Sequence, residues 1–115
     1  MKFMMQIYQG EALEAWARMS EDEQQVIAAD WGAINSTPGV TPGLGLGMPD
    51  TARTVRVVNG SAVTTDGPFA EAKEALGGYF VYETDDLESA LALAARVPSA
   101  RFGGAVEVRP IVESW

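Results

Sequence analysis

The sequence predicts an α+β fold, because segments with strand and helix character follow one another along a chain of one-domain size. Their order is strand, helix, strand with a hairpin, strand, helix, strand. Two βαβ-like halves within 115 residues indicate a ferredoxin-like sandwich with an inserted β-hairpin and helices on one sheet face. With 47% apolar and 21% charged residues, we expect residues 1–115 to form a single globular domain.

The first strand is expected at residues 3–8, a short apolar run bounded by Gly10. Successive side chains point to opposite faces of a strand, and here both sets are largely apolar. We therefore expect both faces of this strand to be covered.

Two helices are expected next. Residues 11–19 carry an apolar stripe at helical spacing, formed by Leu13, Trp16 and Ala17. Ser20 and Glu23 then stand at the spacing of a capping box, in which each side chain bonds the other's backbone amide. The helix that Ser20 starts is expected to end near Asn35.

Residues 37–50 predict a loop, because this stretch holds three prolines and four glycines. We expect it to be more mobile than the rest, with a short edge strand at residues 44–48, and to serve as a flexible edge or a lid over a cleft. Its glycines do not match the spacing of dinucleotide- or phosphate-binding loops.

A β-hairpin is expected from residue 54 to residue 65. Asn59-Gly60 is the typical pair of a type I′ turn, since both central positions need positive φ. On the strand before the turn, Val55 and Val57 are expected to face inward and Arg56 outward.

The last three elements are a strand at residues 78–83, a helix that begins at Asp85 and Asp86, and a strand at residues 105–112. Pro98 is expected to end the helix. Its expected buried stripe consists of Leu87, Ala90, Leu91 and Ala94.

Composition excludes several function classes. A net charge of −8 repels phosphate backbones, so we expect no nucleic-acid partner. The absence of cysteine and histidine excludes a Ser-His-Asp triad, a thiolate nucleophile and the usual zinc and haem ligands. We expect no cofactor and no metal. With neither a signal peptide nor a membrane span recognisable, we expect no membrane association and a cytoplasmic location.

The most informative segment is DGPFAEAKEALGG, at residues 66–78. Asp66 ends a strand where its carboxylate can bond amides ahead of it, and Pro68 fixes φ at the start of the following turn. Phe69 places a large apolar side chain beside polar groups, and Glu71, Lys73 and Glu74 add charges of both signs.

This segment resembles the signature of the DGPF family within the YCII-related proteins, at Asp66 to Phe69, Glu71, Lys73, Glu74, Gly77 and Gly78. The resemblance covers most of the chain except residues 36–50. It implies a dimeric α+β barrel, in which two ferredoxin-like sheets pack face to face. The His-Asp dyad suggested for the wider group does not carry over, because this chain has no histidine.

The candidate site centres on that segment. Asp66, Glu71 and Lys73 are the candidate catalytic residues, a carboxylate base beside a cation. The candidate ligand-binding residues are Arg56, Phe69, Glu74 and Tyr79. The alternative is that Asp66 caps a turn while the Glu–Lys pairs hold the loop in shape. Asp66, Glu71 and Glu74 also offer oxygen ligands, but the lysine among them disfavours Mg²⁺ or Ca²⁺.

We predict a homodimer, because a sheet with helices on one face leaves an apolar face uncovered. The function expected first is binding of a small polar or anionic ligand in a cleft near the DGPF turn. The alternatives are an isomerase- or lyase-like acid-base enzyme that uses Asp66 with Glu71 or Lys73, and an interaction module linked to transcriptional regulation.

Overall fold

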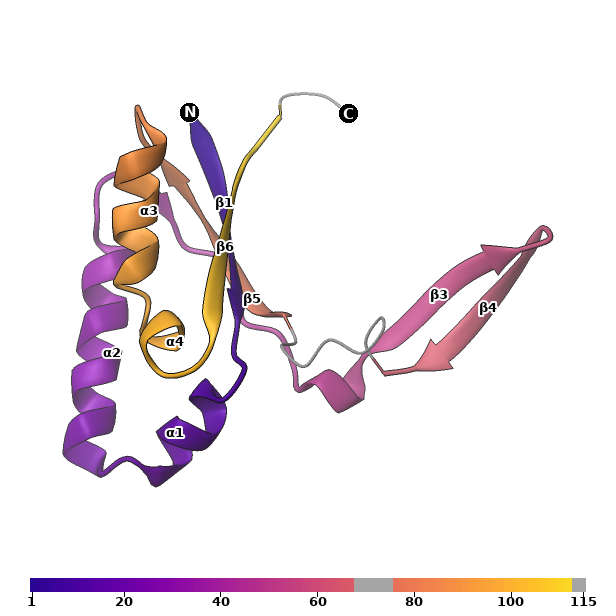
Figure 1. Ribbon diagram of the computed structural model, residues 1–115, viewed down its shortest axis with the longest axis horizontal. Coiled ribbons are helices and arrows are strands. Elements are labelled where there is room, and N and C mark those ends of the chain that lie inside the picture. The colour runs from indigo at the N-terminus through magenta and orange to yellow at the C-terminus, as the bar shows by residue number, and fades with distance from the viewer. Residues whose placement is uncertain (68–75, 113–115) are drawn as a thin grey trace.

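The computed structural model describes residues 1–67 and 76–112 (Figure 1). It is an α+β structure in which helices cover one face of a four-stranded antiparallel sheet, and a separate two-stranded hairpin projects away from this body (Figure 1). The strand order in the larger sheet is β2-β5-β1-β6, and the described strands form no closed barrel. The strands of this sheet are β1 (Lys2–Tyr8), β2 (Val40–Thr41), β5 (Leu76–Glu83) and β6 (Ala105–Pro110).

The helical layer confirms the predicted cap. Ser20 Oγ accepts from the Glu23 amide at 3.2 Å, and Glu23 Oε1 accepts from the Ser20 amide at 3.2 Å, so both halves of the capping box are present. None of the described helices is long and apolar enough to cross a membrane. The helices are α1 (Ala12–Arg18), α2 (Glu21–Asn35), α3 (Leu87–Ala95) and α4 (Pro98–Arg101).

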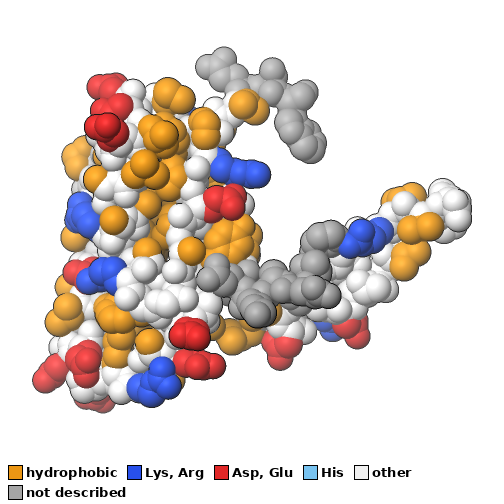
Figure 2. Space-filling model, viewed as in Figure 1, with side chains coloured by type: hydrophobic (Ala, Val, Ile, Leu, Met, Phe, Trp, Pro, Cys, Tyr) orange, Lys and Arg blue, Asp and Glu red, His pale blue; other side chains and the backbone are white. Residues whose placement is uncertain are grey.

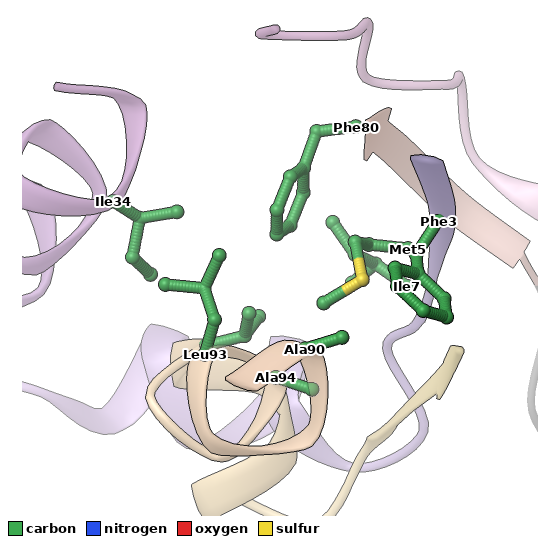
Figure 3. Packing of buried hydrophobic residues seen from close by; sticks show 9 residues of the cluster. Phe3, Met5, Ile7, Ile34, Phe80, Ala90, Leu93 and Ala94 are labelled. Atoms are coloured by element: carbon green, nitrogen blue, oxygen red, sulfur yellow. The ribbon is translucent and has the colours of Figure 1, made fainter. Parts of the chain in front are cut away.

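The core lies between the sheet and the helices. Alternate residues of β1 point into it and meet Phe80 of β5, Ile34 of α2 and Leu93 of α3 (Figure 3). Trp31 packs its ring edge-on against Phe80, with the ring centroids 6.2 Å apart. The buried members of β1 are Phe3, Met5 and Ile7.

Within the described residues of one chain, the other face of β1 is only partly covered, so the expected cover of both faces is not found there. Met4 lies beside Val81 on β5, and Gln6 lies between Tyr79 on β5 and Glu107 on β6. These side chains share the sheet face opposite the helices, because directly paired residues of neighbouring strands point to the same side.

The apolar stripes of two helices differ from the expectation. In α3 the buried residues are Ala90, Leu93 and Ala94, whereas Leu87 and Leu91 are about half exposed. In α1 only Ala12 is buried, and the predicted stripe of Leu13, Trp16 and Ala17 is exposed.

Two boundaries at the C-terminal end also differ. Helix α3 ends at Ala95, and Pro98 is the first residue of α4 rather than a plain stop, since a proline fits the first helical turn. The last strand ends at Pro110, two residues before the expected end.

The predicted hairpin is present as β3 (Arg53–Val58) and β4 (Ser61–Asp66), with positive φ at Asn59 and Gly60. It does not join the larger sheet. Val55 and Val57 are therefore 61% and 71% exposed instead of facing a core, because none of the other described residues forms a layer over the hairpin. Hydrophobic side chains are visible along the projecting hairpin (Figure 2).

The proline- and glycine-rich segment 37–50 is partly paired. It contributes β2, and further along Gly45 forms an isolated bridge with Gly78 at the start of β5. The short edge strand expected at residues 44–48 is thus reduced to this one bridge. A 3-10 turn over Pro49–Thr51 then leads into the hairpin.

Candidate functional site

Asp66, the first candidate catalytic residue, lies at the end of β4 and pairs with Arg53 of β3. Its Oδ1 is 3.2 Å from Arg53 Nε, in an ion pair whose side chains are 90% and 57% exposed. Gly67, which follows, adopts φ of 90° and donates its amide to Ala52 O at 2.8 Å. Asp66 is therefore the exposed last residue of β4, with a surface ion pair that contributes little to stability.

Arg56 and Tyr79 stand on different sheets. Arg56 lies on the hairpin opposite Val63, and Tyr79 lies on β5 opposite Gln6. The other four predicted site residues, Phe69, Glu71, Lys73 and Glu74, lie outside the described residues.

A cleft opens immediately after the DGPF segment, where β5 begins. Its volume is about 310 Å³, and it is bounded by β5, the end of α2 and the loop 42–45. The loop is held to β5 by two backbone hydrogen bonds, from Leu46 N to Gly77 O at 2.9 Å and from Tyr79 N to Leu44 O at 3.2 Å. The cleft is lined by Ile7, Gln9, Trp31, Asn35, Pro42 to Gly45, and Gly77 to Phe80.

Glycines make this close packing possible. A Cβ on Gly43 would lie 1.9 Å from Tyr79 O, and a Cβ on Gly77 would lie 2.6 Å from Gln9 Cγ. Any larger residue at Gly43 would therefore separate the loop from β5, and one at Gly77 would displace the Gln9 side chain. Gly77 belongs to the predicted signature, so one role of the glycine pair is to let Gln9 approach β5.

The cleft offers neutral hydrogen-bonding groups. The side chains of Gln9 and Asn35 supply amides at its wall, and none of the described lining residues is charged. This suits recognition of polar groups on a small ligand. Sequence reasoning did not identify Gln9 or Asn35, because neither belongs to a motif; the only sequence signal was the unusual loop, predicted to border a cleft.

Comparisons with known proteins agree with the motif. The YCII-related domain matches residues 1–114 of the chain. An uncharacterised protein of Rhizobium meliloti (strain 1021) is 39% identical over 66 residues. That stretch is 56% of this chain and 53% of the relative, so the match spans about half the length of the curated relative.

Proposed function

The chain belongs to the YCII-related family, and on that premise we propose that it works as a homodimer that binds a small polar or anionic ligand in the cleft beside Gly77 and Gly78. In this proposal each chain is a ferredoxin-like unit, and two sheets pack face to face as a dimeric α+β barrel. The antiparallel strand order β2-β5-β1-β6, with helices between β1 and β2 and between β5 and β6, supports this arrangement.

The observation that carries the dimer is the uncovered sheet face. Met4, Tyr8, Tyr79 and Val81 are only partly buried there, and Gln6 Oε1 is buried without a hydrogen-bond partner among the described residues. An unsatisfied buried acceptor costs about 1–3 kcal/mol. A second copy that packs on this face would bury the apolar side chains and supply donors for Gln6.

The projecting hairpin supports the same conclusion. An isolated two-stranded hairpin is marginally stable in water, so it needs a surface to pack on. Val55 and Val57 share one face of it with Ala62 and Thr64, while Val58 lies on the other face. We assign the Val55–Val57 face to contact with the second copy.

The dimer is tested by light scattering coupled to size exclusion at micromolar protein. The expected mass is twice 12.3 kDa. Val57→Lys should weaken the dimer at least tenfold, whereas Val58→Lys places the same charge on the opposite face and should leave the mass unchanged. A monomeric mass for the unaltered chain, independent of concentration, would contradict the proposal, and equal behaviour of the two variants would contradict the assigned hairpin face.

Ligand binding is tested separately, by thermal shift with a panel of small carboxylates, phosphates and polyols. A compound at 100 times its Kd stabilises the folded chain by about 2.7 kcal/mol, which is a shift of several degrees in Tm. Asn35→Ala should reduce the shift because Asn35 lines the cleft, and Gln25→Ala, an exposed change elsewhere on α2, should not. Equal shifts in both variants would place the ligand outside this cleft.

The acid-base alternative has no specific geometric support among the described residues. A general base gains strength from burial, and Asp66 is 90% exposed and paired with Arg53. We therefore keep ligand binding as the proposed function.

A further inference from the structure

A second cavity lies in the helical layer, on the side of the sheet opposite to the uncovered face. Its volume is about 440 Å³, and α1, α2 and α4, which surround it, lie close together at one end of that layer (Figure 1). Cavities that hold small molecules have volumes of roughly 300–1,000 Å³. The space is therefore large enough for an organic ligand.

The lining of this cavity is aromatic and uncharged. Trp16 comes from α1, Trp31 from α2, and Phe102 follows α4. Trp16 is 41% exposed and its neighbour Leu13 is 38% exposed, so large apolar side chains of α1 face the cavity rather than the core. Because burying apolar surface on binding is favourable, an apolar occupant would be favoured here.

One polar pair marks the wall of the cavity. Ser99, which is only 5% exposed, donates its hydroxyl to Gln9 Oε1 at 2.9 Å. This bond occupies the carbonyl oxygen of Gln9, whose Nε2 has no acceptor among the described residues. Gln9 Nε2 lies instead against Gly77, where an added Cβ would be 3.0 Å from it, on the side of the other cleft. The bond to Ser99 therefore pairs the polar atoms on this wall and leaves the cavity largely apolar.

Charge argues for a neutral occupant. A charged group would lose its hydration against the largely apolar side chains that the described residues supply to this cavity. The cation nearest in sequence to Phe102, Arg101, is already paired with Asp30 at 2.6 Å and lies 5.5 Å from the Phe102 ring.

We propose that this cavity binds a neutral aromatic molecule of one or two rings. The rings pack among Trp16, Trp31 and Phe102. This site is distinct from the cleft beside Gly77, although Gln9 and Trp31 line both. It does not depend on the dimer, because its walls come from one chain.

The test uses prodan, a neutral two-ring naphthalene with a ketone whose emission shifts to the blue in apolar surroundings. We expect saturable binding of one prodan per chain, with the blue shift and with quenching of tryptophan fluorescence.

Two matched variants locate the binding. Ala28 lines the cavity and Ala29 does not, yet both are exposed positions in the middle of α2. Ala28→Phe fills the space and should weaken prodan binding at least tenfold, whereas Ala29→Phe adds the same ring outside and should not change it. The proposal would be overturned if Ala28→Phe and Ala29→Phe both bind prodan as the unaltered chain does, if both lose binding equally, or if binding does not saturate.

A third variant separates this site from the proposed function. Asn35→Ala alters the cleft but no residue of the helical cavity, so prodan affinity should stay unchanged. Loss of prodan binding in Asn35→Ala would assign the probe to the cleft and overturn the second site. Failure of the polar panel with prodan binding intact would instead contradict the proposed function alone.

Discussion

Gly43→Ala is the sharpest test of how the loop 42–45 is held against β5. A Cβ at this position would lie 1.9 Å from Tyr79 O, about 1.1 Å closer than the 3.0 Å that real Cβ contacts keep. Neither Gly43 nor Gly45 has a positive φ, so the effect of alanine is steric and not conformational. The loop must move away from β5, and overpacking of this kind costs about 1–3 kcal/mol.

Gly45→Ala is the matched control in the same loop, because its Cβ would meet nothing within 4 Å. At a compatible φ, replacing glycine by alanine stabilises a protein by about 0.4–1 kcal/mol. Urea denaturation should therefore show Gly43→Ala destabilised and Gly45→Ala unchanged or stabilised. The Leu46 amide bonds to Gly77 O on β5, and the Tyr79 amide bonds to Leu44 O in the loop. Hydrogen exchange at both amides should become faster in Gly43→Ala but not in Gly45→Ala. Two variants of equal stability, with both amides still protected, would refute this account of the cleft wall.

Three further predictions concern stability. Ile34→Ala removes a core side chain that is 1% exposed and should cost about 2–5 kcal/mol in urea denaturation, whereas Val26→Ala, at a 61% exposed position of the same helix, should cost less than about 0.5 kcal/mol. The Ser89 backbone amide, and then the Ser89 hydroxyl, lower the pKa of Asp86 in the folded chain. The ionised Asp86 therefore stabilises the fold above the unfolded carboxyl pKa of about 3.9, and this stabilisation is lost as the pH falls through the lower folded pKa. Thermal melts in this acid range should show a weaker dependence of Tm on pH in Asp86→Asn. The dependence should be retained in Asp85→Asn. Asp66→Asn should lower the free energy of unfolding by no more than about 1 kcal/mol, because the Asp66 side chain is 90% exposed and its ion pair with Arg53 lies on the surface. A larger loss would contradict this surface position.

Local signals in the sequence were sufficient wherever the structure depends on a few neighbouring residues. The capping box needs only Ser20 and Glu23, and the type I′ turn needs only Asn59 and Gly60. Both are present because their hydrogen bonds and φ angles are set within a few residues. The α+β class followed from the same kind of evidence, the order of short periodic segments.

Periodicity failed where two faces of an element are almost equally apolar. In α3, Leu87 and Leu91 compete with Leu93 for burial, and the sheet accepts the face that carries Ala90, Leu93 and Ala94. A face with two alanines lets the helix approach β6 closely. Such a choice depends on residues far away in the sequence.

The candidate site was only partly predictable, for a related reason. The signature directed attention to charged residues, most of which lie outside the described part of the chain, and to Asp66, which is on the surface. The described cleft depends instead on contacts between segments far apart in sequence, such as Gln9 against Gly77 and Gly43 against Tyr79. The spacing of residues within one segment therefore could not predict these contacts.

The hairpin shows that an alternating pattern need not lead to burial within one chain, since Val55 and Val57 are exposed. A compact chain of this length has a radius of gyration near 13 Å, whereas this one has 16.1 Å because the hairpin extends from the body. Val55 and Val57 alternate with Arg56, which is the pattern of a strand with one buried face. A solitary hairpin gains nothing from that alternation, since water reaches both of its faces. In the proposed dimer this alternation would be used, and the proposal predicts that the Val55–Val57 face meets the second copy rather than the face that carries Arg56, Val58 and Val63.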